Sequence, residues 1–286
     1  MKILFLVLLV LVPGTSPRVR SDREINQLQG TVRTVKTSRA MFVDGKEGQR
    51  KPWQAMTFDS NGNYIEYTIY SNDNPSTYNF TNKYNSDGSA SETIRSGSGE
   101  KTVFVYPSDN RRIEKITQTN DGHPLDKWLY IFDELGNKTR EEHILIDRTL
   151  GARLVKPIDV IVFRYDSQSR LTEEEYFGHN GSKATNPIVP IHRRTYVYNS
   201  QGRPIEITNY KIDGAIFTRT AFQYDESGHL SESTIYNAAS AVPGKNTYSD
   251  YDAHGNWGHQ IISTVSQTGA TTLAPSQSVY ETFTYY

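Results

Sequence analysis

The sequence contains no cysteine, no block of like charge and, apart from its first residues, no long apolar run. Without cysteine, a disulfide, a lipid-anchored cysteine, a thiolate zinc site and a cysteine nucleophile are all excluded. Lys and Arg number 31 against 32 for Asp and Glu, so the formal net charge is -1, and no electrostatic attraction for nucleic acid follows. Neither a Gly-rich phosphate loop nor a nucleophile elbow occurs, and no cofactor is expected.

Residues 1–16 have the pattern of a signal peptide: Lys2, an apolar run from Ile3 to Val12, then small residues near Pro13. The run is far shorter than the roughly 20 residues of a membrane-spanning helix, although an uncleaved anchor is the alternative. We therefore expect an exported protein, periplasmic or extracellular, that does not span the membrane once the signal is removed. We expect residues 17–27 to form a flexible N-terminal arm and residues 28–286 to form a single β-repeat domain.

One short pattern returns along most of the chain: an aromatic residue at a strand end, Asp or Asn next, and Gly four places after the aromatic. Eight copies align on the aromatics at 58, 84, 106, 132, 165, 198, 224 and 251, with the looser ones at 106 and 165, and a spacing of 22 to 33 residues is typical of repeat architectures. The predicted turn residues are Phe58, Asp59, Gly62, Tyr84, Asn85, Gly88, Phe132, Asp133, Gly136, Tyr165, Asp166, Tyr198, Asn199, Gly202, Tyr224, Asp225, Gly228, Tyr251, Asp252 and Gly255.

Each column of this pattern has a local physical reason. Asp or Asn can bond its side chain to the backbone two residues on and so start a turn. Gly accepts the left-handed backbone that ends a three-residue hairpin loop. The pattern therefore predicts a series of β-hairpins, each specified by its own turn.

Two further columns accompany the turn. Eight places after the aromatic comes a carboxylate in six copies, and two places before it comes a second aromatic in five copies. If the loop has three residues, these two columns lie opposite one another on one face of the sheet. The carboxylates are Glu66, Glu92, Glu114, Glu173, Glu206 and Glu232; the second aromatics are Phe104, Tyr130, Phe163, Tyr196 and Phe222.

The fold class predicted from these features is all-β: an antiparallel up-and-down meander of about 16 to 18 strands, forming a curved or coiled open sheet. In such a meander the short turns share one end and the variable loops share the other. Loops on a rigid scaffold usually carry binding, so that rim is the predicted binding surface, unless the loops vary only because nothing constrains them. The loops are 43–52, 71–76, 96–100, 120–124, 148–157, 178–190, 237–246 and 268–278.

The turn sequences also resemble a known family. Tyr-Asp-Glu-Ser-Gly-His-Leu at 224–230 and Tyr-Asp-Ser-Gln-Ser-Arg-Leu at 165–171 resemble the tyrosine-aspartate (YD) repeats of the RHS family. The resemblance implies an antiparallel sheet that coils into a shell or part of one. The chain is too short for a full shell and shows no toxin domain, so it looks more like the small exported YD-repeat proteins of bacteria.

Three alternatives can be judged from the residues: a zinc site, a glycosidase and an outer-membrane barrel. Asp252, His254 and His259 straddle one turn and could converge on zinc, but Asp252 already has a turn role, so no metal site is predicted. The glutamate column could serve a glycosidase, yet six equivalent carboxylates are more simply a solvated ladder. An outer-membrane barrel is disfavoured because strand 137–144 has charge on both faces, which leaves no lipid-facing band.

The favoured function is a non-enzymatic exported scaffold or binding protein of the cell envelope or extracellular space, with a protein or a glycan as its partner. The alternative is a glycan-acting hydrolase that uses carboxylates in a shell-lined cleft. A third possibility is a remnant of a larger shell that needs neighbours to cover its edge strands.

Overall fold

The computed structural model describes residues 20–71, 74–107, 111–147, 153–154, 157–179, 188–238, 243–265 and 272–286. Its elements are α1 (Asp22–Ile25), β1 (Val32–Val43), β2 (Lys46–Glu47), β3 (Lys51–Phe58), β4 (Tyr64–Ser71), β5 (Asn74–Tyr84), β6 (Ala90–Arg95), β7 (Lys101–Val105), β8 (Arg112–Gln118), β9 (Pro124–Phe132), β10 (Lys138–Asp147), β11 (Arg153–Leu154), β12 (Asp159–Tyr165), β13 (Leu171–His179), β14 (Ile188–Tyr198), β15 (Pro204–Lys211), β16 (Ile216–Tyr224), β17 (Leu230–Asn237), β18 (Gly244–Ser249), β19 (His259–Val265) and β20 (Leu273–Tyr285).

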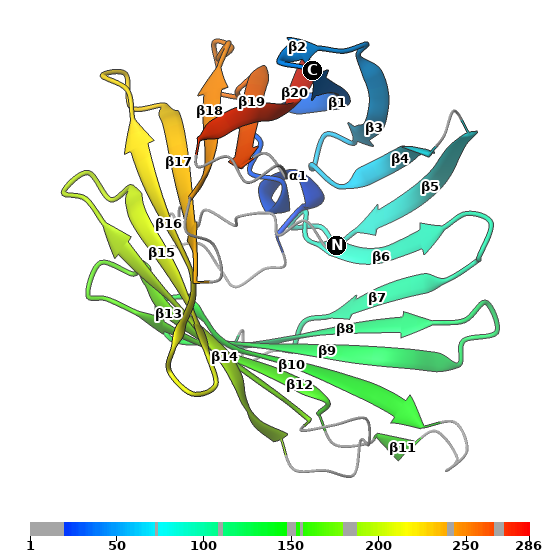
Figure 1. Ribbon diagram of the computed structural model, residues 1–286. Helices are drawn as coiled ribbons and strands as arrows, with labels where there is room; N and C mark the ends of the chain where they lie inside the picture. The colour runs from blue at the N-terminus through cyan, green and yellow to red at the C-terminus, as the bar shows by residue number, and fades with distance from the viewer. Residues whose placement is uncertain are drawn as a thin grey trace.

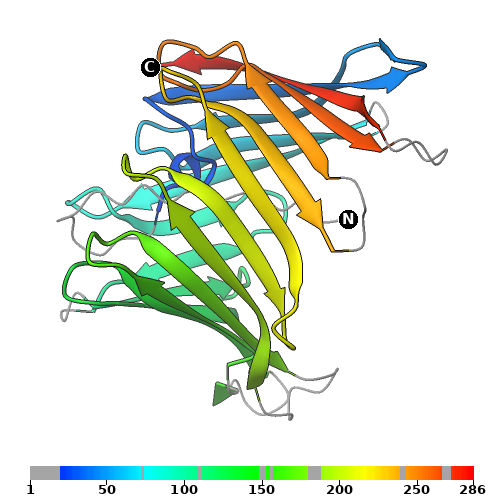
Figure 2. The same ribbon diagram turned by 60° about the vertical axis from the view of Figure 1, so that its left-hand side comes forward.

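These strands form one closed antiparallel barrel. Each long strand pairs with the next along the chain, and β1 pairs with both β3 and β20, from Val32 opposite Tyr285 to Met41 opposite Gln277. The two-residue strands β2 and β11 only extend hairpins, so 18 of the 20 strands make up the wall. Figure 1 shows the ring, in which the red β20 returns to the blue β1, and Figure 2 shows the same wall turned.

The predicted open sheet is therefore wrong. Strand β1, at the start of the wall, pairs with β3 and also with β20 at the far end of the chain. A twisted antiparallel sheet of this many strands can curl until its edges meet, and closure leaves no exposed edge. Local turn signals cannot reveal this step, because the pairing partners Thr37 and Glu281 lie at opposite ends of the sequence.

Strand pairing also tells which side chains point inward. Paired residues of an antiparallel sheet point to the same face, and Val35 is paired with both Met56 and Phe283. Leu28, just after α1, packs on the cluster that contains Val35 and Met56, and Figure 1 shows α1 within the ring of strands. The face that carries Val35 is therefore the inner wall.

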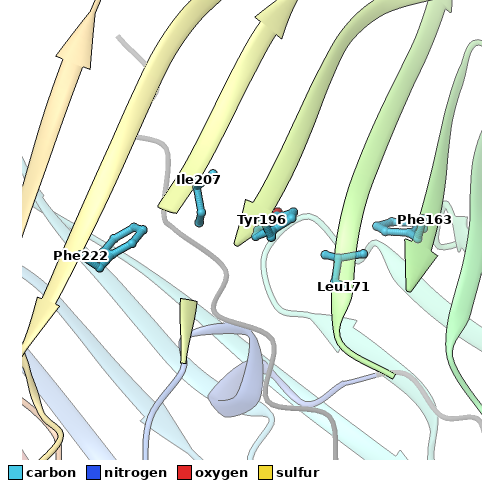
Figure 3. Close-up of a cluster of buried hydrophobic side chains, with 5 residues drawn as sticks. All are labelled: Phe163, Leu171, Tyr196, Ile207 and Phe222. Carbon is cyan, nitrogen blue, oxygen red and sulfur yellow. The ribbon is translucent and has the colours of Figure 1, made fainter. Parts of the chain in front are cut away.

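Two packed clusters lie on the inner wall, at the end where the short turns gather. Val32, Val35, Met56 and Phe58 form one cluster on β1 and β3, and Phe163, Leu171, Tyr196, Ile207 and Phe222 form the other on β12–β16 (Figure 3). Fully burying such a side chain stabilises a fold by about 1.5–3 kcal/mol. The tight-turn end is thus the well-packed end of the barrel.

Residues 20–31 lie across this packed end. Helix α1 begins with a capping box between Ser21 and Glu24. The Arg23 N–H donates to the Gly62 carbonyl at 2.8 Å, and a Cβ on Gly62 would lie 2.9 Å from Ser21 Oγ, so the arm needs a glycine there. Within the described part of the chain, no helix has the length and apolarity to cross a membrane.

Candidate functional site

The repeated turns lie together at the packed end of the barrel. In the first copy the Gly62 N–H donates to the Asp59 carbonyl at 3.0 Å, the Asp59 N–H donates to the Asn63 carbonyl at 2.9 Å, and Gly62 has φ 88°. Asp59 Oδ1 also accepts from the Asn63 N–H at 3.0 Å. The same backbone bond from the glycine position occurs at Gly88, Gly136, Ser169, Gly202, Gly228 and Gly255. Residues 108–110 of the copy at 106 lie outside the described residues.

The motif tyrosine has a second role, which the sequence pattern does not reveal. In five of the six copies with a tyrosine, its hydroxyl donates to a backbone carbonyl in the preceding hairpin, six residues after the aromatic of the preceding copy; Tyr84 instead donates to the Asp59 carboxylate. The pairs are Tyr106 to Ala90 (2.8 Å), Tyr165 to Lys138 (2.8 Å), Tyr198 to Leu171 (2.7 Å), Tyr224 to Pro204 (2.7 Å) and Tyr251 to Leu230 (2.5 Å). These bonds join neighbouring hairpins, so the role of the turns is structural. The candidate binding surface therefore lies elsewhere on the barrel.

The expected placement of the glutamate column is wrong. Each of the six carboxylates pairs with the residue directly before the motif aromatic, as Glu232 does with Gln223 and Glu173 with Arg164. In five of these six hairpins the register shifts by one residue beside the motif aromatic, for example between Gln223 and Tyr224. A one-residue shift moves a side chain to the other face. The six glutamates therefore point outward and cannot line a cleft inside the shell, as the glycosidase alternative requires.

The outward glutamates belong to a belt of alternating charge around the barrel. Every barrel strand from β5 to β18 contributes to it, and its ion pairs include Lys83–Glu92 (2.6 Å), Lys127–Glu114 (2.8 Å) and Lys245–Glu232 (2.5 Å). We call the following residues the outer charge belt: Lys83, Glu92, Lys101, Glu114, Lys127, Arg140, Glu142, Arg164, Glu173, Glu175, Arg193, Glu206, Arg219, Glu232 and Lys245.

The three residues weighed as zinc ligands do not converge. His254 lies against Tyr285, whereas His259 stacks on Tyr280 with 4.4 Å between ring centroids. Asp252 instead accepts hydrogen bonds from the Tyr285 hydroxyl and from the Asn256 backbone. No group of three or more His, Asp or Glu placed to hold a metal occurs among the described residues.

The inner wall carries a different set of side chains beyond the packed clusters. Strand alternation sends Asp126, Trp128 and Tyr130 inward from β9, where Lys127 and Leu129 point outward. These inward residues are half-buried rather than buried. A barrel of 16 to 18 strands is wide enough to leave an aqueous interior. The inner wall away from the tight turns is therefore the surface where a ligand can meet aromatic and polar groups.

The first group of inner-wall residues is built around His143 of β10. Its ring stacks on Trp128 of β9 with 4.1 Å between centroids and 4° between planes. His143 Nδ1 lies 3.5 Å from Asp159 Oδ2, and Nε2 lies 3.8 Å from Asp126 Oδ2. Asp126 Oδ1 and His143 Nε2 are buried atoms that make no hydrogen bond. This row presents an aromatic ring, an imidazole and two carboxylates side by side.

The second group lies beside it on β13–β15. Tyr176 stacks on His192 with 3.9 Å between centroids, and its hydroxyl donates to Glu174 Oε2 at 2.7 Å. Arg194 bridges Glu174 (3.1 Å) and Asn209 (2.8 Å). Burial, together with the charge of Arg194, lowers the pKa of His192 below its usual 6.5. The ring pair is thus held in place by a compact ionic network, with a neutral imidazole at pH 7. We call Asp126, Trp128, His143, Asp159, Tyr176 and His192 the inner-wall rows.

The sequence interpretation missed the inner-wall rows. The repeat pattern contains neither Trp128 nor His143, so it does not bring them together. The signal that could have found them is symmetry about a turn, because Trp128 and His143 flank the turn at 133–136 and pair directly across β9 and β10. Of the predicted rim loops, residues 72–73, 148–152, 155–156, 180–187, 239–242 and 268–271 lie outside the described residues.

No family model matches the sequence, and no curated protein matches it. Among solved structures, a porin-like protein from Bacteroides uniformis is 9% identical, with a TM-score of 0.46, over 90% of this chain and 99% of that one. A porin-like protein from Bacteroides vulgatus is 10% identical, with a TM-score of 0.29, over 90% and 99%. The complex TcdB2-TccC3-TEV is 11% identical, with a TM-score of 0.22, over 77% and 17%. Because all three TM-scores lie below 0.5, the function proposed below rests on this chain's own residues, and the resemblance to YD repeats stays a prediction.

Proposed function

We propose that this chain is an exported, non-enzymatic binding protein: a water-soluble β-barrel of the cell envelope or extracellular space that holds a protein or glycan partner on its inner wall. The observation that carries the proposal is that the inner-wall rows, inside a closed barrel, are half-buried or, at Asp159, exposed. Aromatic rings with a few placed polar groups are what ligand-binding surfaces typically present.

The outer charge belt supports a water-soluble barrel. A membrane barrel needs an outward apolar band, and an Arg or Lys at the middle of that band costs about 2–4 kcal/mol. Here Lys127 and Glu114 form an ion pair in the outer wall, and Arg164 lies between Glu173 and Glu175. A belt present on every strand from β5 to β18 leaves no continuous apolar band in that part of the wall.

An outer-membrane channel is the second candidate, and one observation favours it. A closed barrel of 18 strands has the width at which membrane barrels enclose water. A water-soluble barrel and a membrane channel can therefore both have a wall of this size. The outer face of the first contacts water, whereas the outer face of the second contacts lipid.

Cell fractionation separates these candidates. The full chain, expressed in a bacterium with a periplasm, is recovered after osmotic shock or from the medium, and the mature protein is partitioned with a detergent that separates into two phases. We expect a processed chain in the osmotic-shock or medium fraction that enters the aqueous phase. Recovery only from outer membranes with detergent would overturn the proposal in favour of the channel. A known soluble periplasmic protein and a known outer-membrane barrel serve as controls in the same cells.

A further inference from the structure

Asp126 and His143 make the inner-wall rows chemically incomplete. Asp126 Oδ1 and His143 Nε2 make no hydrogen bond, although buried polar atoms in folded proteins are normally paired. Asp126 keeps 29% of its side chain exposed, so a turn of its carboxylate brings the free oxygen to the inner surface. A hydroxyl group of a bound ligand would donate to the oxygen that this turn exposes.

Gly178 lies beside the same row. On β13 it pairs with Asp159, and a Cβ added there would lie 3.3 Å from Ile191 Cδ1 and 3.4 Å from Asp159 Oδ1. Asp159 keeps 55% of its side chain exposed. The carboxylate of Asp159 is therefore largely exposed, and a branched side chain at position 178 would extend over it and against Ile191.

Charged groups of both signs surround the inner-wall rows. Arg194 is paired with Glu174, and Lys138 is bonded to Glu141. Lys115 on β8 lies opposite Trp128 and Lys211 on β15 lies opposite His192, so two lysines on this face accompany the carboxylates of Asp126 and Asp159 and neither sign dominates. What stays available to a ligand is the rings of Trp128, Tyr176 and His192, with carboxylates and imidazole nitrogens between them. Such a surface suits a ligand that is uncharged, rich in hydroxyl groups and able to lay an apolar face on a ring.

We infer that the inner-wall rows are a binding site for a neutral glycan chain. Sugar hydroxyls donate to Asp126 and Asp159, which lie on either side of the His143 ring, and the C–H faces of the sugars pack on the rings of Trp128 and Tyr176. This inference rests on the proposed function, because it names the ligand class for the same inner wall.

The test measures binding of neutral oligosaccharides to the mature barrel, residues 17–286, by isothermal titration calorimetry. The probes are oligomers of glucose, galactose, mannose and N-acetylglucosamine, four to eight units long. This length matches the two rows, which cross the neighbouring strands from β9 to β14 at about 4.8 Å per strand. The wild type is expected to bind at least one of them. His143→Gln removes the ring that lies between the Asp126 and Asp159 carboxylates and stacks on Trp128, and it is expected to weaken that binding roughly tenfold or more.

Two further variants sharpen the test. Gly178→Val adds a side chain beside Asp159 without removing any polar group and is expected to weaken binding to a similar extent. Glu142→Gln is the matched control, because Glu142 precedes His143 on β10 and faces the outer wall. It is expected to bind as the wild type does. Circular dichroism confirms that each variant keeps its strand content.

The outcomes are distinct for the two proposals. Wild-type affinity in both His143→Gln and Gly178→Val would overturn the glycan site, as would the binding of charged peptides with no binding of neutral oligosaccharides. Either result leaves a soluble, exported barrel intact as the proposed function. Recovery of the protein only in detergent would instead overturn the proposed function, whatever the sugar titrations show.

Discussion

The motif tyrosine shows how one hydroxyl group links two levels of structure. Its ring packs at the end of a strand, which the sequence pattern predicts, and its hydroxyl bonds to the preceding hairpin, which the pattern does not. At Tyr198 the acceptor is the Leu171 carbonyl, and burial raises the pKa of the Tyr198 hydroxyl to about 12. The hydroxyl is therefore protonated, and a donor, throughout the physiological pH range. Phe132 has no hydroxyl, so its copy lacks this link.

Replacing a motif tyrosine by phenylalanine removes only this bond. We expect Tyr198→Phe and Tyr224→Phe each to lower the free energy of unfolding by about 1 kcal/mol, since each leaves a backbone carbonyl without its partner. Urea unfolding followed by circular dichroism measures the change. Tyr210→Phe is the control, because Tyr210 faces the outer wall beneath Arg193. A loss at Tyr210 equal to those at Tyr198 and Tyr224 would contradict the role given to the hydroxyl.

Glu281 gives the protein a pH dependence at the residue scale. It points inward from β20, accepts a hydrogen bond from Thr37 Oγ1 at 3.2 Å, and burial raises its pKa from 4.5 to about 7. The folded state thus holds a proton that the unfolded chain has already released. The stability that protonated Glu281 provides is complete below about pH 4.5 and is lost as the pH rises through about 7.

Glu281→Gln is expected to keep the neutral form at every pH. Relative to the wild type, the variant should gain roughly 2 kcal/mol at pH 8.5 and almost nothing at pH 4.5, as measured by urea midpoints. Glu232→Gln, on the outer wall, should show no gain that grows between these two pH values. If the difference in the free energy of unfolding between Glu281→Gln and the wild type stays constant from about pH 4.5 to about pH 8.5, the pKa of Glu281 is not raised in the folded state and the pH dependence assigned to it is wrong.

At the scale of the element, the hairpin turn could be predicted and the register above it could not. Asp59 and Gly62 make the turn through bonds within five residues of chain, so their roles are visible in the sequence. The extra residue at position 65, between the pairs Phe58–Tyr64 and Thr57–Glu66, depends on how the twisted strands settle against their neighbours. That one residue decides which face Glu66 occupies. The inner-wall rows were missed for the same reason, because they are defined by register.

The segment at residues 20–31 is an element that the repeat does not encode. Its docking depends on Asn256, whose side chain accepts from the Gln29 N–H at 2.7 Å and donates to the Gln29 carbonyl at 3.0 Å. Asn26 adds a bond to the Tyr64 hydroxyl at 2.7 Å. Residues 20–31 are thus held against the inner wall by these polar contacts together with the packing of Leu28.

Asn256→Ala should loosen this segment. We expect protease sites within residues 20–31 to become at least about tenfold more susceptible, because two hydrogen bonds to Gln29 disappear together, at roughly 1 kcal/mol each. Mass spectrometry of a timed digest locates the cuts. Arg203→Ala changes the equivalent turn position of another copy, where Arg203 bonds to Asn199 and Gln201 of its own turn, and should leave the digest unchanged. Equal digestion of the wild type and Asn256→Ala would show that other contacts hold the arm.

For the whole molecule, closure determines which residues are inside and whether a neighbour is needed. An open sheet would present two unpaired edges, and the third sequence hypothesis assigned those edges to a larger shell. In the closed barrel the backbone groups of β1 and β20 pair with one another, so neither strand is an exposed edge. The sequence predicted the number of strands closely, since strands and turns are local, but not their closure, which joins residues more than 240 positions apart. We therefore expect the mature chain to be a monomer.

The β1–β20 seam can be tested with two neighbouring residues of β20. Phe283 points inward, pairs with Val35 and packs on the cluster that includes Phe58, whereas Thr282 points outward and is exposed. Phe283→Lys places a charge among apolar side chains, so we expect it to destabilise the fold by roughly 3 kcal/mol and to release both edge strands.

Size-exclusion chromatography with light scattering should then show aggregates for Phe283→Lys and a monomer for Thr282→Lys. A monomer for both variants would mean that the seam contributes little to closure, and aggregation of both would mean that any added lysine on β20 disturbs the pairing. Only the contrast between the two faces identifies the seam as the contact that keeps the barrel closed.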